Sequence, residues 1–367
     1  MNVPGGLRVE LLTSSTTLKE RRRILAQLQA GDIQLLVGTH ALLEDVVGFH
    51  SLGVVVVDEQ HRFGVHQRVR LREKGGNISP DVLVMTATPI PRSLALTLFG
   101  DLDVTVLDER PGHIDVTTQL ITPAHAERRD KLYEFVRSQA SDGRQTYVVC
   151  PLVEESDEIA ARAAEAEYIR LRDEVFPDLR VGLIHGRMKS DAKDAVMSAF
   201  RRGELDVLVA TTVIEVGVDV HAATIMIIED AERFGISQLH QLRGRLYRGA
   251  QPNYCVLFAG WSGEISEEAQ RRLDAVVATT DGFVLAETDL DIRGEGQLFG
   301  VRQSGLPDLK LARLIRDLEL VELTREVARE LVGRDPDLVH SNVAALRDEV
   351  VRRYRGGLEE LEALATG

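Results

Sequence analysis

"GVVVVDEQHRFGV", residues 53–65, runs four valines directly into two adjacent carboxylates, Asp58 and Glu59. The apolar run predicts a buried β-strand, and the charged pair marks the point where that strand ends. Carboxylates at the carboxyl end of a strand suit two tasks, which are holding a Mg²⁺ ion and acting on a water molecule. The simpler alternative is that Asp58 only caps the turn that follows.

Strand-like and helix-like segments alternate on both sides of this stretch. A helix is predicted to begin near Ser14 or Ser15 and to end at Gly31. Its apolar face would consist of Leu18, Ile24, Leu25 and Leu28. Buried strands are predicted at "IQLLVGT" (33–39), "LGVVVVDE" (52–59) and "DVLVMTATP" (81–89). Apolar strands separated by helices indicate an α/β protein with a parallel sheet covered on both faces.

The same pattern returns later in the chain. "LQAGDIQLLVGTH" (28–40) aligns with "FRRGELDVLVATT" (200–212), and Gly203 lies 172 residues after Gly31. At that offset Asp58 falls on Asp230, which is followed by Ala231, so the second copy is predicted to have lost half of the carboxylate pair. A period this long indicates two tandem domains. A ligand is then expected between them, at the carboxyl ends of the strands.

Composition excludes several classes of protein. The formal net charge of −14 argues against a protein that coats nucleic acid non-specifically, although it allows a local basic groove. The two cysteines, Cys150 and Cys255, lie in apolar runs, which favours a reduced, cytoplasmic protein. The sequence has no run of about 18 apolar residues, so no membrane association is predicted.

Arginines gather in "QLHQLRGRLYRG", residues 238–249. Arg245 and Arg248 are three residues apart, so on a helix they would share a face and could converge on one phosphate. The alternative is that these two arginines and Arg243 form an ordinary solvated face. Because the other copy of the duplicated fold carries Asp58 and Glu59, we favour a role for Arg245 and Arg248 in phosphoryl transfer.

Five motifs together resemble the RecG family of superfamily-two DNA helicases, in the expected order. They are "DEQHRFGV" (58–65), "TATPIPR" (86–92), "ATTVIEVGVDV" (210–220), "AERFGISQLHQLRGR" (231–245) and "DGFVLAETDLDIRGEGQLFGVRQSG" (281–305). The resemblance implies two tandem RecA-like, doubly wound parallel-sheet domains, the first one incomplete, and a C-terminal helical and loop extension. The implied divisions are domain 1 at 1–107, a linker at 108–117, domain 2 at 118–275 and the extension at 276–367.

The resemblance also implies an ATP-dependent motor that moves on branched double-stranded DNA, such as stalled replication forks and Holliday junctions, in recombination and repair. The expected cofactors are ATP and Mg²⁺, and the protein is expected to be a monomer with a single-stranded-DNA-binding protein as a further partner. Two alternatives stay open. One is the motor of a transcription-repair coupling factor, and the other is a truncated, non-catalytic DNA-binding or regulatory relative.

Residue roles follow from the same resemblance. Asp58 would hold Mg²⁺ through water, Glu59 would act on the attacking water, and Gln241, Arg245 and Arg248 would complete the catalytic set. Gln60, His61, Gly217 and Asp219 would contact the nucleotide. The residues expected to contact DNA, or to couple it to the nucleotide, are Thr39, His40, Thr86, Thr88, His185, Gly186, Arg187, Thr211, Thr212, Arg293 and Gln303. Several of these could instead simply cap helices or turns.

The chain departs from the family pattern at two places. It contains no Gly-x-x-x-x-Gly-Lys-Ser/Thr loop, the motif that cradles the phosphates of a nucleotide. We therefore expect it to be the carboxyl-terminal half of a longer protein, to hydrolyse no ATP alone, and to be less stable over 1–107 than over 118–275. The second departure is Leu246-Tyr247, where the family has Val-Gly, which puts bulk close to the predicted nucleotide site.

Overall fold

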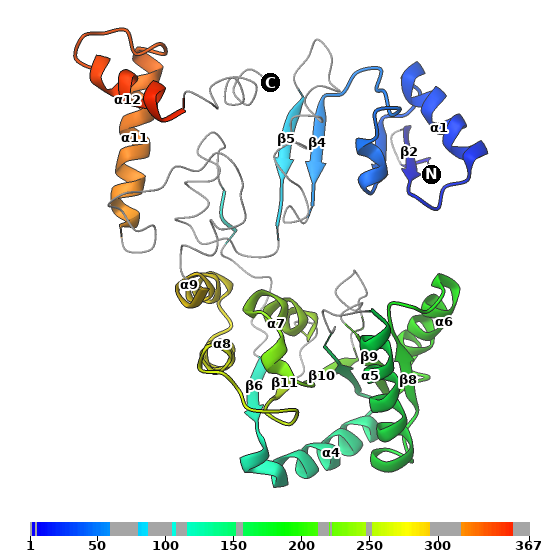
Figure 1. Cartoon of the computed structure of the whole chain (residues 1–367). Coiled ribbons are helices and arrows are strands. Elements are labelled where there is room, and N and C mark those ends of the chain that lie inside the picture. The colour runs from blue at the N-terminus through cyan, green and yellow to red at the C-terminus, as the bar shows by residue number, and fades with distance from the viewer. Residues whose placement is uncertain are drawn as a thin grey trace. The chain divides into compact units, whose positions relative to one another are not determined.

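The computed structural model describes residues 2–3, 6–58, 80–86, 105–107, 116–151, 157–211, 220, 222–246, 252–293 and 317–354. The chain divides into two compact units (Figure 1). Unit 1 contains residues 1–87 and 330–367, and unit 2 contains residues 88–329. The domain boundaries predicted from the motifs, at residues 107, 117 and 275, are a different division and stay a prediction.

Unit 2 is built on one six-stranded sheet in which every neighbouring pair is parallel. The strand order is β6-β11-β10-β7-β9-β8. The central strands are mostly apolar, and every residue of β7, β9 and β10 is buried. The strands are β6 (Val116–Ile121), β7 (Gln145–Val149), β8 (Val181–Ile184), β9 (Val207–Ala210), β10 (Ala223–Ile228) and β11 (Asn253–Phe258). Thus β6 begins inside the segment predicted as a linker.

Helices cover both faces of this sheet, as predicted for a doubly wound fold (Figure 1). Side chains alternate along each strand, so Met226 of β10 packs on one face and Ile227 on the other. One face carries α4 (Ala126–Ser141) and α5 (Asp157–Arg170), which continues into a π-turn at Leu171–Val175. The other carries α6 (Ser190–Arg201), α7 (Ile236–Arg243), α8 (Glu267–Ala278) and α9 (Gly282–Arg293).

Unit 1 contains two small sheets. In the first, β1 (Asn2–Val3) pairs antiparallel with β2 (Leu7–Leu12), which pairs in parallel with β3 (Leu35–Gly38). The helix α1 (Leu18–Ala30) packs against this sheet through Ile24 and Leu28. In the second sheet β4 (Val54–Val57) pairs in parallel with β5 (Asp81–Val84), and the short helix η1 (His40–Leu43) packs against it.

Two sequence-based expectations about unit 1 need correction. The cap of α1 is Thr17, whose hydroxyl accepts a hydrogen bond from the Glu20 N–H at 3.4 Å, and neither Ser14 nor Ser15 has that role. The strands predicted as buried are half exposed. Val54, Val56 and Leu83 are 62%, 57% and 53% exposed, because no described helix covers that face of the β4–β5 pair.

The duplication is visible in the elements themselves. Helix α1 begins at Leu18 and α6 at Ser190, while β3 spans 35–38 and β9 spans 207–210, so both pairs keep the spacing of 172 residues. Each helix is followed by a glycine with positive φ, Gly31 at 81° and Gly203 at 71°. Glycine adopts the left-handed backbone conformation without steric strain. This explains why the chain turns from helix to strand at a glycine in both copies.

The remaining described elements are α11 (Leu318–Arg334) and α12 (Ala344–Tyr354), which lie in the region expected to form the C-terminal helical and loop extension. None of the helices in the described part of the chain is long and apolar enough to span a membrane. Cys150 and Cys255 are both buried free thiols, and burial raises the pKa of Cys255 to about 12.

Candidate active site and nucleic-acid interface

In unit 1 the predicted site residues follow the carboxyl ends of the parallel strands. β4 ends at Val57, which pairs with Val84 at the end of β5, so Asp58 and Thr86 follow neighbouring strand ends. Asp58 is exposed and Thr86 is half-buried. Thr39 follows β3 and is exposed, and His40 begins η1. The structure therefore brings one carboxylate and one hydroxyl residue to the same edge of the β4–β5 pair.

In unit 2 two adjacent strands end in polar residues. β8 and β9 pair Ile184 with Ala210, and the next residues are His185 and Thr211. Both are buried, with His185 9% and Thr211 1% exposed. Gly186 and Arg187 continue from His185 and are exposed. These residues therefore lie at one edge of the sheet, where β8 and β9 end, and their contact with DNA stays a prediction.

Two polar atoms at this edge lack a hydrogen-bond partner. They are Nδ1 of His185 and Oγ1 of Thr211, for which no described residue supplies one. The other ring nitrogen of His185, Nε2, lies 3.5 Å from the Glu165 carboxylate. Buried polar groups are almost always hydrogen-bonded, so each exception requires a reason. A ligand that carries hydrogen-bonding oxygens, held at the ends of β8 and β9, would supply the missing partners.

The end of β10 corrects the sequence alignment of the two copies. β10 ends at Ile228 and is followed by Glu229 and Asp230, just as β4 ends at Val57 and is followed by Asp58 and Glu59. The second copy therefore keeps a carboxylate pair. The alignment misplaced it because the second copy is one residue shorter between the conserved glycine and its strand end.

Both members of this second pair are held by side chains of unit 2. Nη2 of Arg129 donates to Oε1 and Oε2 of Glu229 at 2.9 and 3.2 Å, and Oγ of Ser262 donates to Oδ1 of Asp230 at 2.7 Å. Burial raises the pKa of Glu229 to about 7, although Arg129 acts in the opposite direction. Sequence patterns gave no signal for Arg129, which is one of several arginines on α4.

The arginine-rich segment lies on α7 and on the short helix η7 (Gly244–Leu246). Ile236, Leu239 and Leu242 anchor α7 in the core, which leaves Gln241 and Arg245 half-buried. Leu246, one of the two residues that make up the second departure from the family pattern, is fully buried in that core. The fold therefore accommodates this leucine in its core. Whether the departure puts bulk close to the predicted nucleotide site now depends on Tyr247 alone.

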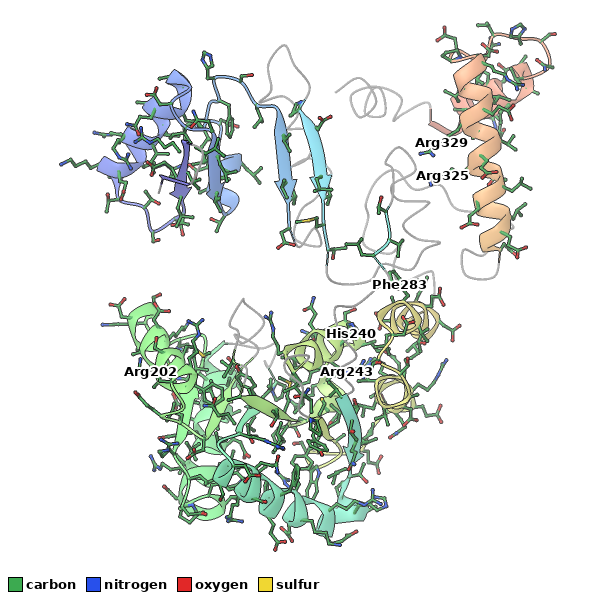
Figure 2. All side chains as sticks on the ribbon, turned by 180° about the vertical axis from the view of Figure 1, so that it is seen from behind. Arg202, His240, Arg243, Phe283, Arg325 and Arg329 are labelled. Atoms are coloured by element: carbon green, nitrogen blue, oxygen red, sulfur yellow. The ribbon has the colours of Figure 1, made fainter. Side chains whose placement is uncertain are left out.

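Arg243 is wholly buried, so the solvated-face alternative is wrong for this residue. Its Nη1 donates to the Val276 carbonyl of α8 at 2.6 Å and to Oγ1 of Thr118 in β6 at 3.4 Å. Its Nη2 lies 3.3 Å from Nδ1 of His240, one turn earlier on α7 (Figure 2). Arg243 thus ties the arginine-bearing helix to its neighbours.

Replacing Arg243 with alanine is expected to destabilise unit 2 by about 3–5 kcal/mol, because a large buried side chain leaves a cavity and unpaired polar partners. Urea unfolding followed by the emission of Trp261, the single tryptophan, measures the change. Arg271→Ala is the matched control, since Arg271 lies on α8, is 60% exposed and pairs with exposed Asp291. It should cost less than about 1 kcal/mol. Equal losses in both variants would contradict the structural role of Arg243.

The other predicted site residues lie outside the described residues. They are Glu59, Gln60, His61, Thr88, Thr212, Gly217, Asp219, Arg248 and Gln303, together with the side chains of His40 and Arg293. Their roles stay predictions. No group of three or more His, Cys, Asp or Glu residues in the described part of the chain is arranged to hold a metal ion.

Three protein families match consecutive parts of the chain. Residues 2–97 match the DEAD/DEAH box helicase family, and residues 127–250 match the helicase conserved C-terminal domain. Residues 279–353 match domain 3, C-terminal, of the ATP-dependent DNA helicase RecG. These matches confirm the predicted fold class, α/β helicase domains with parallel sheets followed by a helical region.

Curated relatives are similar over nearly the whole chain. The ATP-dependent DNA helicase RecG of Synechocystis sp. is 49% identical over 350 residues, which are 95% of this chain and 41% of the relative. RecG of Bacillus subtilis is 47% identical over 345 residues, which are 94% of this chain and 49% of the relative. The chain therefore spans less than half the length of these two relatives.

Solved structures lead to the same family as the curated relatives. A structure of RecG bound to a three-way DNA junction is 46% identical, with a TM-score of 0.61, and the match covers 86% of this chain and 40% of that one. The helicase Lhr of Mycobacterium smegmatis, bound to single-stranded DNA and AMP-PNP, is 18% identical with a TM-score of 0.53 over 75% of this chain and 37% of that one. The second likeness concerns the fold alone.

Proposed function

Because the chain belongs to the RecG family of ATP-dependent DNA helicases and matches their C-terminal motor region, we propose that it is the motor of an enzyme that moves on branched DNA. The observation that carries the proposal is at the carboxyl edge of the unit 2 sheet. There His185 and Thr211 are buried with polar atoms that have no partner among the described residues. The phosphate oxygens of a DNA backbone would supply those partners without any dependence on sequence.

For ATP hydrolysis we assign three tasks to residues of this chain. Asp58 holds Mg²⁺ through water, a task that suits an exposed carboxylate oxygen at a strand end. Glu59 orients the attacking water, with Gln60 and His61 beside the nucleotide. Gln241, Arg245 and Arg248 stabilise the charge of the transferring phosphoryl group, while Gly217 and Asp219 contact the nucleotide. Bound Mg²⁺ would neutralise charge on the phosphates.

For DNA we assign backbone contact, or its coupling to the nucleotide, to residues at strand ends and in the extension. Thr211 donates a hydrogen bond to a phosphate oxygen, His185 contacts the backbone beside it, and exposed Arg187 adds a positive charge. The remaining members of this set are Thr39, His40, Thr86, Thr88, Gly186, Thr212, Arg293 and Gln303. The relative in complex with a three-way junction supports branched DNA as the substrate class.

Thr211→Val is expected to weaken binding to a three-way junction about three- to tenfold, the loss of roughly one hydrogen bond, without lowering the melting temperature. The hydroxyl has no partner in the described residues, so removing it costs the free protein nothing. Fluorescence anisotropy and thermal unfolding measure the two effects. Thr224→Val is the matched control, because its hydroxyl is equally buried and unpaired but lies at the start of β10. Equal affinity losses in both variants would refute the assignment.

We further propose that the 367-residue chain alone does not hydrolyse ATP. Its sequence has no glycine-rich loop with a lysine to hold the β- and γ-phosphates, so the carboxylates and arginines have no anchored triphosphate on which to act. Phosphate release in the presence of three-way junction DNA should stay at the blank level. Fusing the loop-bearing segment of a relative in front of residue 1 should restore DNA-stimulated hydrolysis. Turnover by the chain alone that Asp58→Ala abolishes would overturn this proposal.

The remaining proposals concern organisation and context. We take 1–107 as helicase domain 1, 108–117 as linker, 118–275 as helicase domain 2 and 276–367 as the extension. The motor acts as a cytoplasmic monomer, and a single-stranded-DNA-binding protein is a further partner. Analytical sedimentation of the purified chain, with and without junction DNA, tests whether it is a monomer.

A further inference from the structure

A half-buried group of charged side chains lies where β10 ends, on the face covered by α4 and α5. Arg129, in the first turn of α4, pairs with Glu229 and also donates from Nε to the Tyr133 hydroxyl at 2.8 Å. Arg170, at the end of α5, donates to the same hydroxyl at 2.9 Å and to Glu167 at 2.7 Å. The Tyr133 hydroxyl thus joins two arginines, and the group connects α4, α5 and β10.

Aromatic rings from β11 and from the segment after it hold Arg129 in place. Its guanidinium carbon lies 4.5 Å from the ring centroid of Phe258 and 4.6 Å from that of Trp261. Contacts of this kind are attractive and are stronger where water is excluded. Ser262, next to Trp261, donates to Asp230. Two consecutive residues after β11 therefore hold the two residues that follow β10. Trp261 packs on Arg129, which binds Glu229, and Ser262 binds Asp230 directly.

The segment that follows β10, residues 229–246, is fixed at three successive points. Glu229 is held by Arg129, Asp230 by Ser262, and the Glu232 carbonyl by Nη2 of Arg272 at 3.0 Å. Asp230 has φ 45° and ψ 49°, a left-handed conformation that is unfavourable for residues other than glycine. Strained backbone persists only where its surroundings over-determine it. The same segment continues into α7 and η7, which carry Gln241 and Arg245.

Stability alone is a poor explanation for this arrangement. Arg129 and Glu229 are only 17% and 14% exposed, so both charges lose much of their hydration, and well-packed apolar side chains often stabilise a core equally well. What the pair adds is one defined geometry, since Nη2 of Arg129 donates to both oxygens of Glu229 while its Nε donates to Tyr133, which fixes the planar guanidinium at two points. We infer that Arg129 is a positioning residue which, by holding Glu229 against α4, fixes the segment 229–246 that carries Gln241 and Arg245.

Hydrogen exchange of the 367-residue chain tests this inference directly. Arg129→Met should raise exchange across 229–246 about tenfold or more while β8 and β9 stay as protected as in the wild type. Arg137→Met is the matched control on the same helix, because Arg137 also lies over an aromatic ring, Phe176, but pairs with exposed Asp178. It should leave 229–246 unchanged. A uniform rise across unit 2, or no rise in 229–246, overturns the inference.

A second variant excludes a simple failure to fold. Arg129→Gln combined with Glu229→Gln replaces the ion pair with a neutral pair that can still hydrogen-bond, so neither charge is left alone. The double variant should exchange more slowly over 229–246 than Arg129→Met does. If residues 229–246 exchange as fast in the double variant as in Arg129→Met, or faster, the result would contradict the role given to the Arg129–Glu229 pair.

Activity tests the consequence of the inference, which rests on the proposed function. In the fusion that carries the phosphate-binding loop, Arg129→Met should lower kcat about tenfold while the affinity for DNA changes less than about twofold. If the wild-type fusion hydrolyses no ATP, the proposed function fails, whereas the exchange result still decides the role of Arg129. An active fusion in which Arg129→Met loosens the segment but leaves kcat unchanged would overturn the catalytic consequence drawn here, namely that hydrolysis depends on this positioning.

Discussion

Arg245→Ala in the motor that carries a phosphate-binding loop is expected to lower kcat by about three orders of magnitude, with a smaller change in ATP affinity. In the role proposed for Arg245 the cation would act mainly where negative charge develops on the transferring phosphoryl group, so its loss would raise the energy of the transition state more than that of the bound ground state. The structure provides the rigid mounting that this role requires. Arg245 is half-buried between the fully buried residues Leu242 and Leu246, which fix the backbone on both sides.

Two further variants make the result interpretable. Arg245→Lys keeps the charge but loses the planar fork, so it should recover only a small part of the activity. Arg202→Ala is the control for a change of net charge. Arg202 lies just after α6, before β9 begins, and pairs with Glu204 on the surface (Figure 2). Its removal should leave kcat within about twofold of the wild type. A loss in Arg245→Ala no larger than that in Arg202→Ala would remove Arg245 from the catalytic set.

The alternation of apolar runs and caps was sufficient to predict the parallel α/β fold, because strands buried on both faces leave a continuous apolar pattern. It was insufficient to choose the first residue of α1. The stretch 13–17 reads "TSSTT", in which every residue can cap a helix. In the structure Thr13 and Ser15 hydrogen-bond to each other at 2.9 Å, and Thr17 caps the helix. That choice depends on contacts that no sequence pattern contains.

Tertiary partners also explain the errors around the site. In the sequence Arg243 could not be distinguished from Arg245 and Arg248, and only the Val276 carbonyl, 33 residues later, shows why it is buried. The Glu229–Asp230 pair was missed because an ungapped alignment cannot register a loop shorter by one residue. The motifs after residue 280 were the most informative part of the sequence. The match of residues 279–353 to RecG domain 3 favours RecG over a transcription-repair coupling factor.

The second large effect is expected in hydrogen exchange, where the strands of unit 1 should exchange about a thousandfold faster than those of unit 2. The duplicated strands β3 and β9 provide the matched comparison, because they occupy equivalent positions and have similar sequences, LLVG and VLVA. All four residues of β9 are buried, whereas Leu35 and Val37 of β3 are 52% and 47% exposed. An amide in β9 exchanges only when most of unit 2 opens, but an amide in β3 needs only local opening.

The comparison also separates two explanations for the exposed strands of unit 1. A two-stranded sheet such as β4–β5 is marginally stable by itself in water, and its exposed valines contribute little to a core. If a further segment normally covers these strands, fusing the loop-bearing segment of a relative should slow exchange in β3, β4 and β5 and leave β9 unchanged. If β3 in the 367-residue chain is already as protected as β9, unit 1 is a stable body in its own right. The predicted difference in stability between residues 1–107 and 118–275 would then be wrong.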